Sequence, residues 1–194
     1  KMIEVLKKDF PGAEIIIVDD DSPDKTWQVV EEICNKYSNL RLIRRRKRGL
    51  ASAIRNGIDA AGGSIIVWLD CDFSMPPGII NNLIDCINNN YDIAVASRYI
   101  EQGIDARDST VRVWASRFLN KYAKRLLGSS VNDLTSGFIA SNKTVFNNIE
   151  IRGYYGEYCI DFLVHAERMG LKIKEVPYEC LPRLGGQTKT APNF

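Results

Sequence analysis

The chain has 194 residues, of which 45% are hydrophobic, which is enough for one compact domain with its own apolar core. Basic residues number 26 against 24 acidic residues, and this formal net charge of +2 argues against nucleic acid as a partner. The five cysteines include no CxxC pair, which indicates reduced thiols in the cytosol. The single histidine, His165, excludes a histidine-based metal cluster.

Apolar runs alternate along the chain with segments of helical periodicity, beginning with a helix over residues 1–9. Strands are predicted at residues 13–19, 40–43, 64–69, 92–96, 137–141 and 171–179. Helices are predicted at residues 24–37, 49–61, 76–89, 109–127 and 157–169. This alternation favours an α/β fold with a mostly parallel, twisted sheet covered by helices. We expect one domain over residues 1–194, shortened at both ends, and no apolar run approaches the roughly 20 residues of a membrane span.

The strand at residues 64–69 ends in two carboxylates, Asp70 and Asp72. Open α/β sheets bind ligands in the crevice beyond the carboxyl ends of their strands. Paired carboxylate oxygens at such an edge suit Mg²⁺ or Mn²⁺ bridging a substrate diphosphate. Two solvated loop aspartates are the alternative for this segment taken alone.

The first predicted strand also ends in carboxylates, within residues 19–24 (DDDSPD). Asp19 and Asp20 can accept hydrogen bonds from a nucleobase or a ribose hydroxyl, whereas Ser22 and Asp24 suit the cap of the next helix. Both functions are compatible. Further along, a basic run at residues 44–48 directly precedes the predicted helix at residues 49–61.

The helix that follows this basic run begins with the sequence GLASA at residues 49–53. Helix N-termini attract phosphate, and arginines can clamp it with two hydrogen bonds. Anionic lipid head groups would gain about 1 kcal/mol for each basic residue near the surface, and a solvated loop is the third possibility. No aromatic residues interleave with the run, so nucleic-acid binding is poorly supported.

The predicted helix at residues 109–127 has Arg112 and Ser116 four residues apart, and therefore on one face. Trp114, Phe118 and Tyr122 form a separate stripe at the same spacing. This combination suits an amphiphile with a phosphate head group, although an ordinary surface arginine beside core aromatics is an equal alternative. After the last strand, the glycines and cations of residues 183–189 suit an anion-binding loop that closes over a diphosphate.

In this order, the motifs resemble the family 2 glycosyltransferases and, within them, the dolichol-phosphate (polyprenyl-phosphate) mannosyltransferase group. The resemblance extends over nearly the whole chain. The matching stretches are residues 18–24 (VDDDSPD), 49–53 (GLASA), 70–77 (DCDFSMPP), 97–99 (SRY), Arg112 with Ser116, 133–138 (DLTSGF), 175–177 (EVP) and 183–189 (RLGGQTK).

The resemblance implies a GT-A fold and an inverting, metal-dependent transfer of a hexose, mannose from GDP-mannose, to a polyprenyl or dolichyl phosphate. It also implies a peripheral protein at the cytoplasmic face of a membrane. Carried over, the metal site comprises Asp70, Asp72 and Ser74. The implied substrate-binding residues are Asp19, Asp20, Gly49, Ala53, Asp70, Arg98, Arg112, Ser116, Arg183 and Lys189. The implied catalytic residues are Asp72, Arg112 and Arg183.

The absence of a well-placed histidine agrees with a phosphate acceptor. Sugar transfer to a hydroxyl needs a general base, whereas a phosphate with a second pKa near ~6 is already mostly anionic at neutral pH. Two alternatives stay open. One is a family 2 enzyme that uses UDP-glucose or another donor with a hydroxyl acceptor and Asp133 or Asp161 as base. The other is a non-catalytic module that binds a nucleotide or a phospholipid.

The chain departs from the family pattern at several positions. The opening strand of the family, with its Pro…Tyr-Asn-Glu segment, is absent before Lys1. Asp21 stands where the family usually has glycine, and Ser74 where it often has glutamine. Ile139 replaces a common arginine, and Asp161 a usual glutamate.

Overall fold

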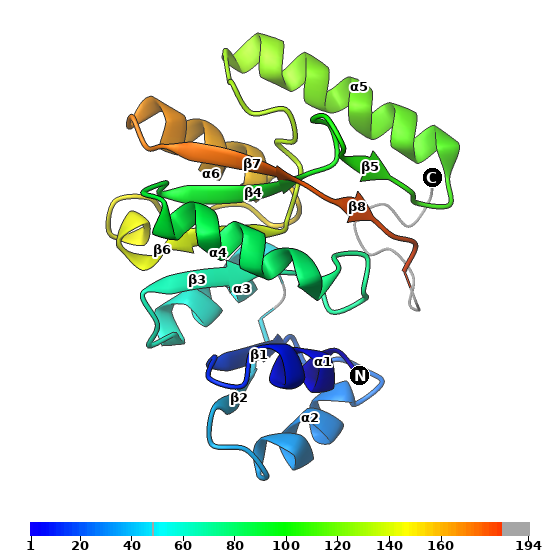
Figure 1. Ribbon diagram of the computed structural model, residues 1–194. Coiled ribbons are helices and arrows are strands. Elements are labelled where there is room, and N and C mark those ends of the chain that lie inside the picture. Colours follow the sequence, from blue (N-terminus) through cyan, green and yellow to red (C-terminus); the bar gives the residue numbers. More distant parts are fainter. Residues whose placement is uncertain (48, 184–194) are drawn as a thin grey trace.

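The computed structural model describes residues 1–47 and 49–183 (Figure 1). Its helices are α1 (Met2–Asp9), α2 (Thr26–Cys34), α3 (Leu50–Ala60), α4 (Ile80–Asn88), α5 (Thr110–Leu127) and α6 (Tyr158–Arg168), with short 3₁₀ helices η1 (Pro77–Ile79) and η2 (Lys143–Asn147). Its strands are β1 (Ile15–Asp19), β2 (Leu40–Arg44), β3 (Ile65–Trp68), β4 (Ile93–Ser97), β5 (Ile104–Asp105), β6 (Ile139–Asn142), β7 (Ile173–Pro177) and β8 (Glu179–Cys180). The α/β class is confirmed.

The described strands pair in three groups, and most of the pairs are parallel. β1 and β2 form one parallel pair, and β5 and β8 form another. The central sheet has the order β3-β6-β4-β7, in which β4 and β7 are parallel while β6 runs antiparallel to both neighbours. Figure 1 shows the β1–β2 pair below this sheet, with α2 beside it. The carboxyl ends of β3, β4 and β7 therefore lie along one edge.

The central sheet separates two apolar cores. All five residues of β4 are buried, and successive side chains of a strand point to opposite faces. Ile93 and Val95 pack with Phe162 of α6 on one face. Ala94 packs with Leu83 of α4 on the other. This two-sided burial explains why β4 is a continuous apolar run with no polar alternation.

The last predicted strand is the clearest difference from the sequence-based elements. The expected strand at residues 171–179 is two strands, because β7 ends at Pro177 and β8 then pairs with β5 instead of β4. Strand β5 was not predicted. A tight turn after β4 brings β5 beside β8. A Cβ at Gly103 in this turn would lie 2.6 Å from the Ser97 carbonyl oxygen, so only glycine fits.

The helix termini follow local capping chemistry. Ser109 caps α5 by accepting a hydrogen bond from the Arg112 N–H, and Gly128 ends the helix in the left-handed conformation with φ 66°. The predicted helix at residues 76–89 begins instead with the 3₁₀ turn η1, which has Pro77 at its first position. Within the described residues, no helix is both long enough and apolar enough to cross a membrane.

Candidate active site

The acidic pair lies in a tight turn immediately after β3. Asp72 Oδ1 accepts hydrogen bonds from the Ser74 backbone N–H at 3.0 Å and from Ser74 Oγ at 2.6 Å. This is an Asx-type turn, and Phe73 inside it has φ 63°. A phenylalanine in that left-handed conformation is strained, and such strain is commonly stored at functional sites. The turn thus fixes the direction in which the Asp72 carboxylate points.

Arg183, far along the chain, is brought to this turn. Its Nε lies 2.9 Å from Asp72 Oδ2, and both side chains stay partly accessible to solvent. The contact follows from the backbone, because the Leu181 N–H donates to the Ser74 carbonyl at 3.0 Å. The structure therefore joins two residues that the sequence analysis placed at the chemistry.

A divalent cation fits the chemistry of this acidic pair. Burial raises the pKa of the Asp70 carboxyl, the neighbouring charge of Asp72 raises it further, and Arg183 lowers it in part. Two mutually repelling carboxylates are relieved by a hard cation such as Mg²⁺ or Mn²⁺. The described residues contain no group of three or more His, Cys, Asp or Glu side chains suited to a metal. Asp70 and Asp72 would therefore share the ion with oxygens of a diphosphate substrate and water.

Ser74, the third predicted metal ligand, is hydrogen-bonded to the second, Asp72. Its hydroxyl donates to Asp72, and its side chain is buried, with the residue only 6% exposed. Since the hydroxyl is used to hold Asp72, we assign Ser74 to the turn that orients the acidic pair.

The β3 end is anchored to α6 on the side of the larger core. Trp68 Nε1 donates to the Tyr158 hydroxyl at 3.1 Å. The Trp68 ring also packs edge-on against Phe146 and Phe162, with centroids about 6 Å apart. These contacts fix the last strand residue before the acidic pair.

The carboxylates after β1 fold their own loop. Asp19, which is 8% exposed, accepts a hydrogen bond from the Ser22 N–H at 2.7 Å. Asp20 lies 2.7 Å from Arg45 Nε and accepts from the Gly49 N–H at 3.1 Å. Asp21 has φ 57°, which explains why glycine is usual at this position.

Arg45 of the basic run and the start of α3 make internal contacts. Arg45 is buried, and besides Asp20 its guanidinium contacts Asn56 at 2.7 Å and Ser52 at 3.1 Å. The Gly49 N–H is taken by Asp20, and the Leu50 N–H donates to the Tyr154 carbonyl.

The backbone N–H of Ala53, in the first turn of α3, also has an internal partner, because it donates to the Gly49 carbonyl at 3.0 Å. Of these two N–H groups, only that of Gly49 thus joins the start of α3 to the loop after β1. The predicted substrate-binding roles of Gly49 and Ala53 stay predictions.

Arg98, which the resemblance places at the acceptor, forms an internal ion pair with Asp133. Its guanidinium makes paired hydrogen bonds to Asp133 at 2.7 and 2.6 Å, and the Arg98 backbone N–H donates to the same carboxylate at 3.0 Å. Asp133 is completely buried and Arg98 nearly so. Burial lowers the pKa of the guanidinium, but the hydrogen bonds and charge of Asp133 outweigh it and raise that pKa well above its ordinary value.

Ser116 belongs to a second hydrogen-bond network, which the sequence analysis did not predict. The Tyr99 hydroxyl lies 2.8 Å from Ser116 Oγ and 3.0 Å from Asp105 Oδ2. Asp105 in turn binds Arg107 with two hydrogen bonds of 2.7 and 2.6 Å. Ser116 and the exposed Arg112 lie on one helix, as the spacing predicted.

This network predicts a pH effect on stability. Burial would raise the pKa of the Asp105 carboxyl, but hydrogen bonds and charge from Arg107 lower it below its ordinary value. The stabilisation is therefore complete above the ordinary pKa of about 3.9 and is lost as the pH falls through the folded-state value. In Arg107→Gln, the free energy of unfolding should fall at pH 7 and change less between pH 7 and pH 3 than in the wild type. Urea unfolding at both pH values checks this; an unchanged pH dependence contradicts it.

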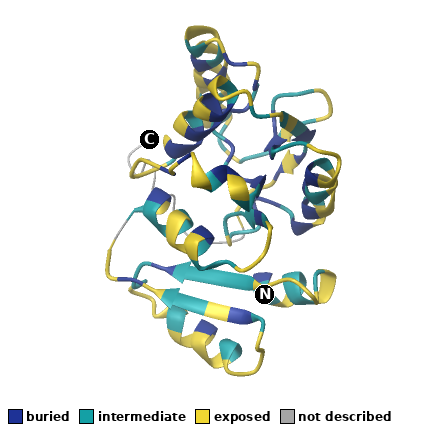
Figure 2. Cartoon of the chain, turned by 90° about the vertical axis from the view of Figure 1, so that its left-hand side faces the viewer, coloured by how far each residue is buried: buried dark blue, intermediate teal, exposed yellow. Residues whose placement is uncertain are grey.

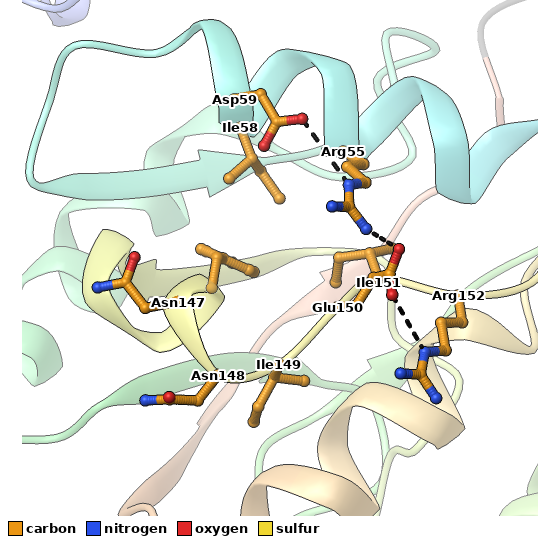
Figure 3. Close-up of a pocket in the computed structure, with 10 residues that line it drawn as sticks. Arg55, Ile58, Asp59, Asn147, Asn148, Ile149, Glu150, Ile151 and Arg152 are labelled. Carbon is orange, nitrogen blue, oxygen red and sulfur yellow. Dashed lines mark hydrogen bonds and ion pairs between the residues drawn. The ribbon is translucent and has the colours of Figure 1, made fainter.

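A cavity of about 280 Å³ lies between α3 and the loop before α6 (Figure 3). Arg55 pairs there with Glu150 and lies 3.8 Å from Asp59, while Arg152 lies 3.5 Å from Glu150. The charged side chains that line the cavity compensate one another, and the Arg55–Glu150 pair joins α3 to the loop. The remaining predicted residue, Lys189, lies outside the described residues.

The site and the fold together define a class of protein. A mostly parallel sheet covered by helices, with an Asp-x-Asp pair at the carboxyl end of β3, is the arrangement of the GT-A fold of nucleotide-sugar transferases. A model described as glycosyl transferase family 2 matches residues 1–150. The chain belongs to this family, as the motifs indicated.

Two curated relatives match most of the chain. It is 34% identical over 179 residues to a dolichol-phosphate mannosyltransferase from Pyrococcus furiosus, covering 91% of this chain and 50% of that protein. It is 32% identical over 193 residues to a polyprenol monophosphomannose synthase from Mycolicibacterium smegmatis, covering 92% of this chain and 71% of that protein. The chain thus spans about half the length of the first relative.

A solved structure supports the fold. The chain superimposes with a TM-score of 0.63 and 20% identity on glucosyl-3-phosphoglycerate synthase from Mycobacterium tuberculosis in complex with Mn²⁺, uridine diphosphate and glucosyl-3-phosphoglycerate. The match covers 90% of this chain and 61% of that one. At this identity the likeness establishes the GT-A fold.

Proposed function

We propose that this chain is a single catalytic domain that transfers a hexose, with inversion, from a nucleotide sugar to a polyprenyl or dolichyl phosphate. The observation that carries the proposal is the Asp70–Asp72 pair in a fixed turn with Arg183 on Asp72. The names of both curated relatives support mannose as the sugar and a polyprenyl phosphate as the acceptor. We propose GDP-mannose as the donor.

We propose Mg²⁺ or Mn²⁺ as the cofactor, held by Asp70 and Asp72. The Mn²⁺ in the complex of the structural neighbour supports this assignment. When bound, the cation neutralises charge on the leaving nucleoside diphosphate. Arg183 lies against the same carboxylate and is positioned to add a second positive charge there, and we assign Lys189 to the same task. Asp19 and Asp20 would bind the nucleoside at the end of β1.

The acceptor side of the site favours a phosphate. Asp133, one of the two candidate bases for a hydroxyl acceptor, is fully buried and bound by Arg98, so it is not placed to remove a proton. The only histidine, His165, is exposed in the last turn of α6. A phosphate nucleophile needs neither, since it is already anionic. We assign Arg112 and Ser116 to its binding, and propose that the enzyme works peripherally at the cytoplasmic face of a membrane.

The test is transfer of radiolabelled mannose from GDP-mannose to a short polyprenyl phosphate, with Mn²⁺ and with a chelator. We expect label in the lipid fraction only with metal. A folded protein that transfers nothing from GDP-mannose but labels the lipid from UDP-glucose would correct the donor. No transfer from either donor would favour a hydroxyl acceptor or a binding role.

Arg112→Ala should weaken use of the acceptor more than use of the donor. Loss of a charge-assisted phosphate contact of about 1.5–3 kcal/mol predicts a KM for polyprenyl phosphate raised roughly 10-fold or more. The KM for GDP-mannose should stay close to that of the wild type. Arg152→Ala removes another exposed arginine and serves as the control. An Arg112→Ala enzyme with an unchanged acceptor KM contradicts the assignment.

A further inference from the structure

Helix α5 is amphipathic in the reverse sense of a normal surface helix. Its core-facing side includes the buried Asn120 and Ala123. Five of its large apolar side chains are instead at least 57% exposed, namely those of Val111, Trp114, Phe118, Tyr122 and Leu126. Of the two alternatives for the aromatic stripe, the one that places it in the core is therefore excluded. Figure 1 shows the helix at the periphery, at the opposite end of the molecule from β2 and α2, and Figure 2 shows the exposed positions along it.

These exposed residues form one continuous stripe. Val111, Trp114, Phe118 and Tyr122 follow one another at intervals of three or four residues, which places them on one face of a helix. The rings of Phe118 and Tyr122 stack, with centroids 6.3 Å apart and planes 10° apart. A contiguous exposed apolar surface of this kind marks a protein or membrane interaction site.

The charge on α5 indicates what covers this stripe. The helix contains five basic residues and no acidic residue. Four of them line a hollow of about 720 Å³ between α5 and the chain after β4, namely Arg117, Lys121, Lys124 and Arg125. No Asp or Glu lines this hollow. A second copy of the chain packed isologously on the stripe would bring two such basic helices together, whereas anionic lipid phosphates would neutralise them.

We propose that α5 is a membrane-docking helix. It lies in the interface of a bilayer that contains anionic lipids, with the aromatic stripe among the upper acyl chains and the flanking cations on the lipid phosphates. Trp, Phe and Leu combined with Lys and Arg are the composition of such interfacial helices. The inference deepens the proposed function and rests on it for the role of docking. A docked α5 would hold Arg112 and Ser116 at the membrane surface, where the phosphate of a polyprenyl phosphate lies.

The test is co-sedimentation with large unilamellar vesicles of 70% phosphatidylcholine and 30% phosphatidylglycerol, without donor or polyprenyl phosphate. Two variants address the two parts of the surface: Trp114→Ser with Phe118→Ser, and Arg117→Gln with Lys121→Gln and Arg125→Gln. Matched controls carry Val29→Ser with Tyr37→Ser, and Lys8→Gln with Lys36→Gln and Lys172→Gln, all at exposed positions away from α5.

We expect the wild type and both controls to sediment with these vesicles. The charge variant should bind the vesicles about 100-fold more weakly, because each of the three charges removed weakens binding by roughly tenfold or less. The aromatic variant should bind at least tenfold more weakly. Circular dichroism should be unchanged, because the replaced side chains are exposed. Brominated lipids should quench the fluorescence of Trp114 in the wild type, with less quenching in Trp114→Phe.

Three results would overturn the proposal: wild-type protein that stays in the supernatant, full vesicle binding by both α5 variants, or a solution dimer that the aromatic variant dissociates, which would assign the stripe to a second copy. Vesicle binding is measured without any substrate. Its failure therefore leaves the transfer reaction untouched, and an inactive enzyme leaves the docking result untouched.

Discussion

Asp72→Asn should lower metal-dependent sugar transfer by about 10²–10³-fold or more, the usual cost of losing a group that stabilises charge in a transition state. Asparagine keeps the oxygen that accepts both hydrogen bonds from Ser74, so the turn should persist. The negative charge that pairs with Arg183, and that we propose holds the cation, is lost. The free energy of unfolding should therefore stay close to that of the wild type.

The measurement is the initial rate of transfer at saturating Mn²⁺, with urea unfolding of the same samples. Asp85→Asn, at an exposed position on α4, is the matched control for the loss of one carboxylate. An Asp72→Asn protein with full activity would remove Asp72 from the catalytic site. A variant that loses activity only because it unfolds would be recognised in the urea experiment.

Asp133→Ala should lower the free energy of unfolding by about 3–5 kcal/mol, the usual cost of removing one partner of a buried ion pair. Asp133 is fully buried and binds both the backbone and the guanidinium of Arg98. Among the described residues, its loss leaves the buried guanidinium with Thr135 at 2.9 Å and Asp105 at 4.0 Å as hydrogen-bonding and charged neighbours. The Arg98 cation would then have to find water or move.

Urea unfolding of Asp133→Ala, Arg98→Met and the double variant Asp133→Leu with Arg98→Met measures this coupling. The double variant should lose less stability than Asp133→Ala, because it leaves no unpaired charge in the core. A loss below about 1 kcal/mol for Asp133→Ala would place this pair among weak surface ion pairs.

Strand β3 and the position of the acidic pair at its end could be predicted because their signal is local. An apolar run that ends in Asp70 and Asp72 identifies the strand, and the metal site at its carboxyl end stays a proposal. The family order of motifs then placed Arg183 at the same site, and the structure joins it to Asp72. The fold class could be predicted because strand and helix patterns alternate along the whole chain.

The roles of Arg45 and Arg98 could not be predicted from local sequence. An arginine that binds phosphate and one that fills a buried ion pair look the same in a motif, because the distinguishing partner is remote in the chain. For Arg98 that partner is Asp133, and for Arg45 it is Asp20. The burial of a charge is a property of tertiary structure.

The exposure of the stripe on α5 could not be predicted for a related reason. Helical periodicity shows that Trp114, Phe118 and Tyr122 share a face, but it does not show whether that face meets the core. Here Asn120 and Ala123 occupy the core side. The short strands β5 and β8 were also missed, since two residues give no periodicity to detect.

The most direct test of the central claim is a competition between acceptors in one reaction. Equal amounts of a polyprenyl phosphate and the corresponding polyprenol would be incubated with the protein, GDP-[¹⁴C]mannose and Mn²⁺. The account predicts label only in the acid-labile mannosyl phosphodiester, because a phosphate nucleophile needs no base whereas the polyprenol hydroxyl does. Label in the acid-stable glycoside of the polyprenol would contradict it.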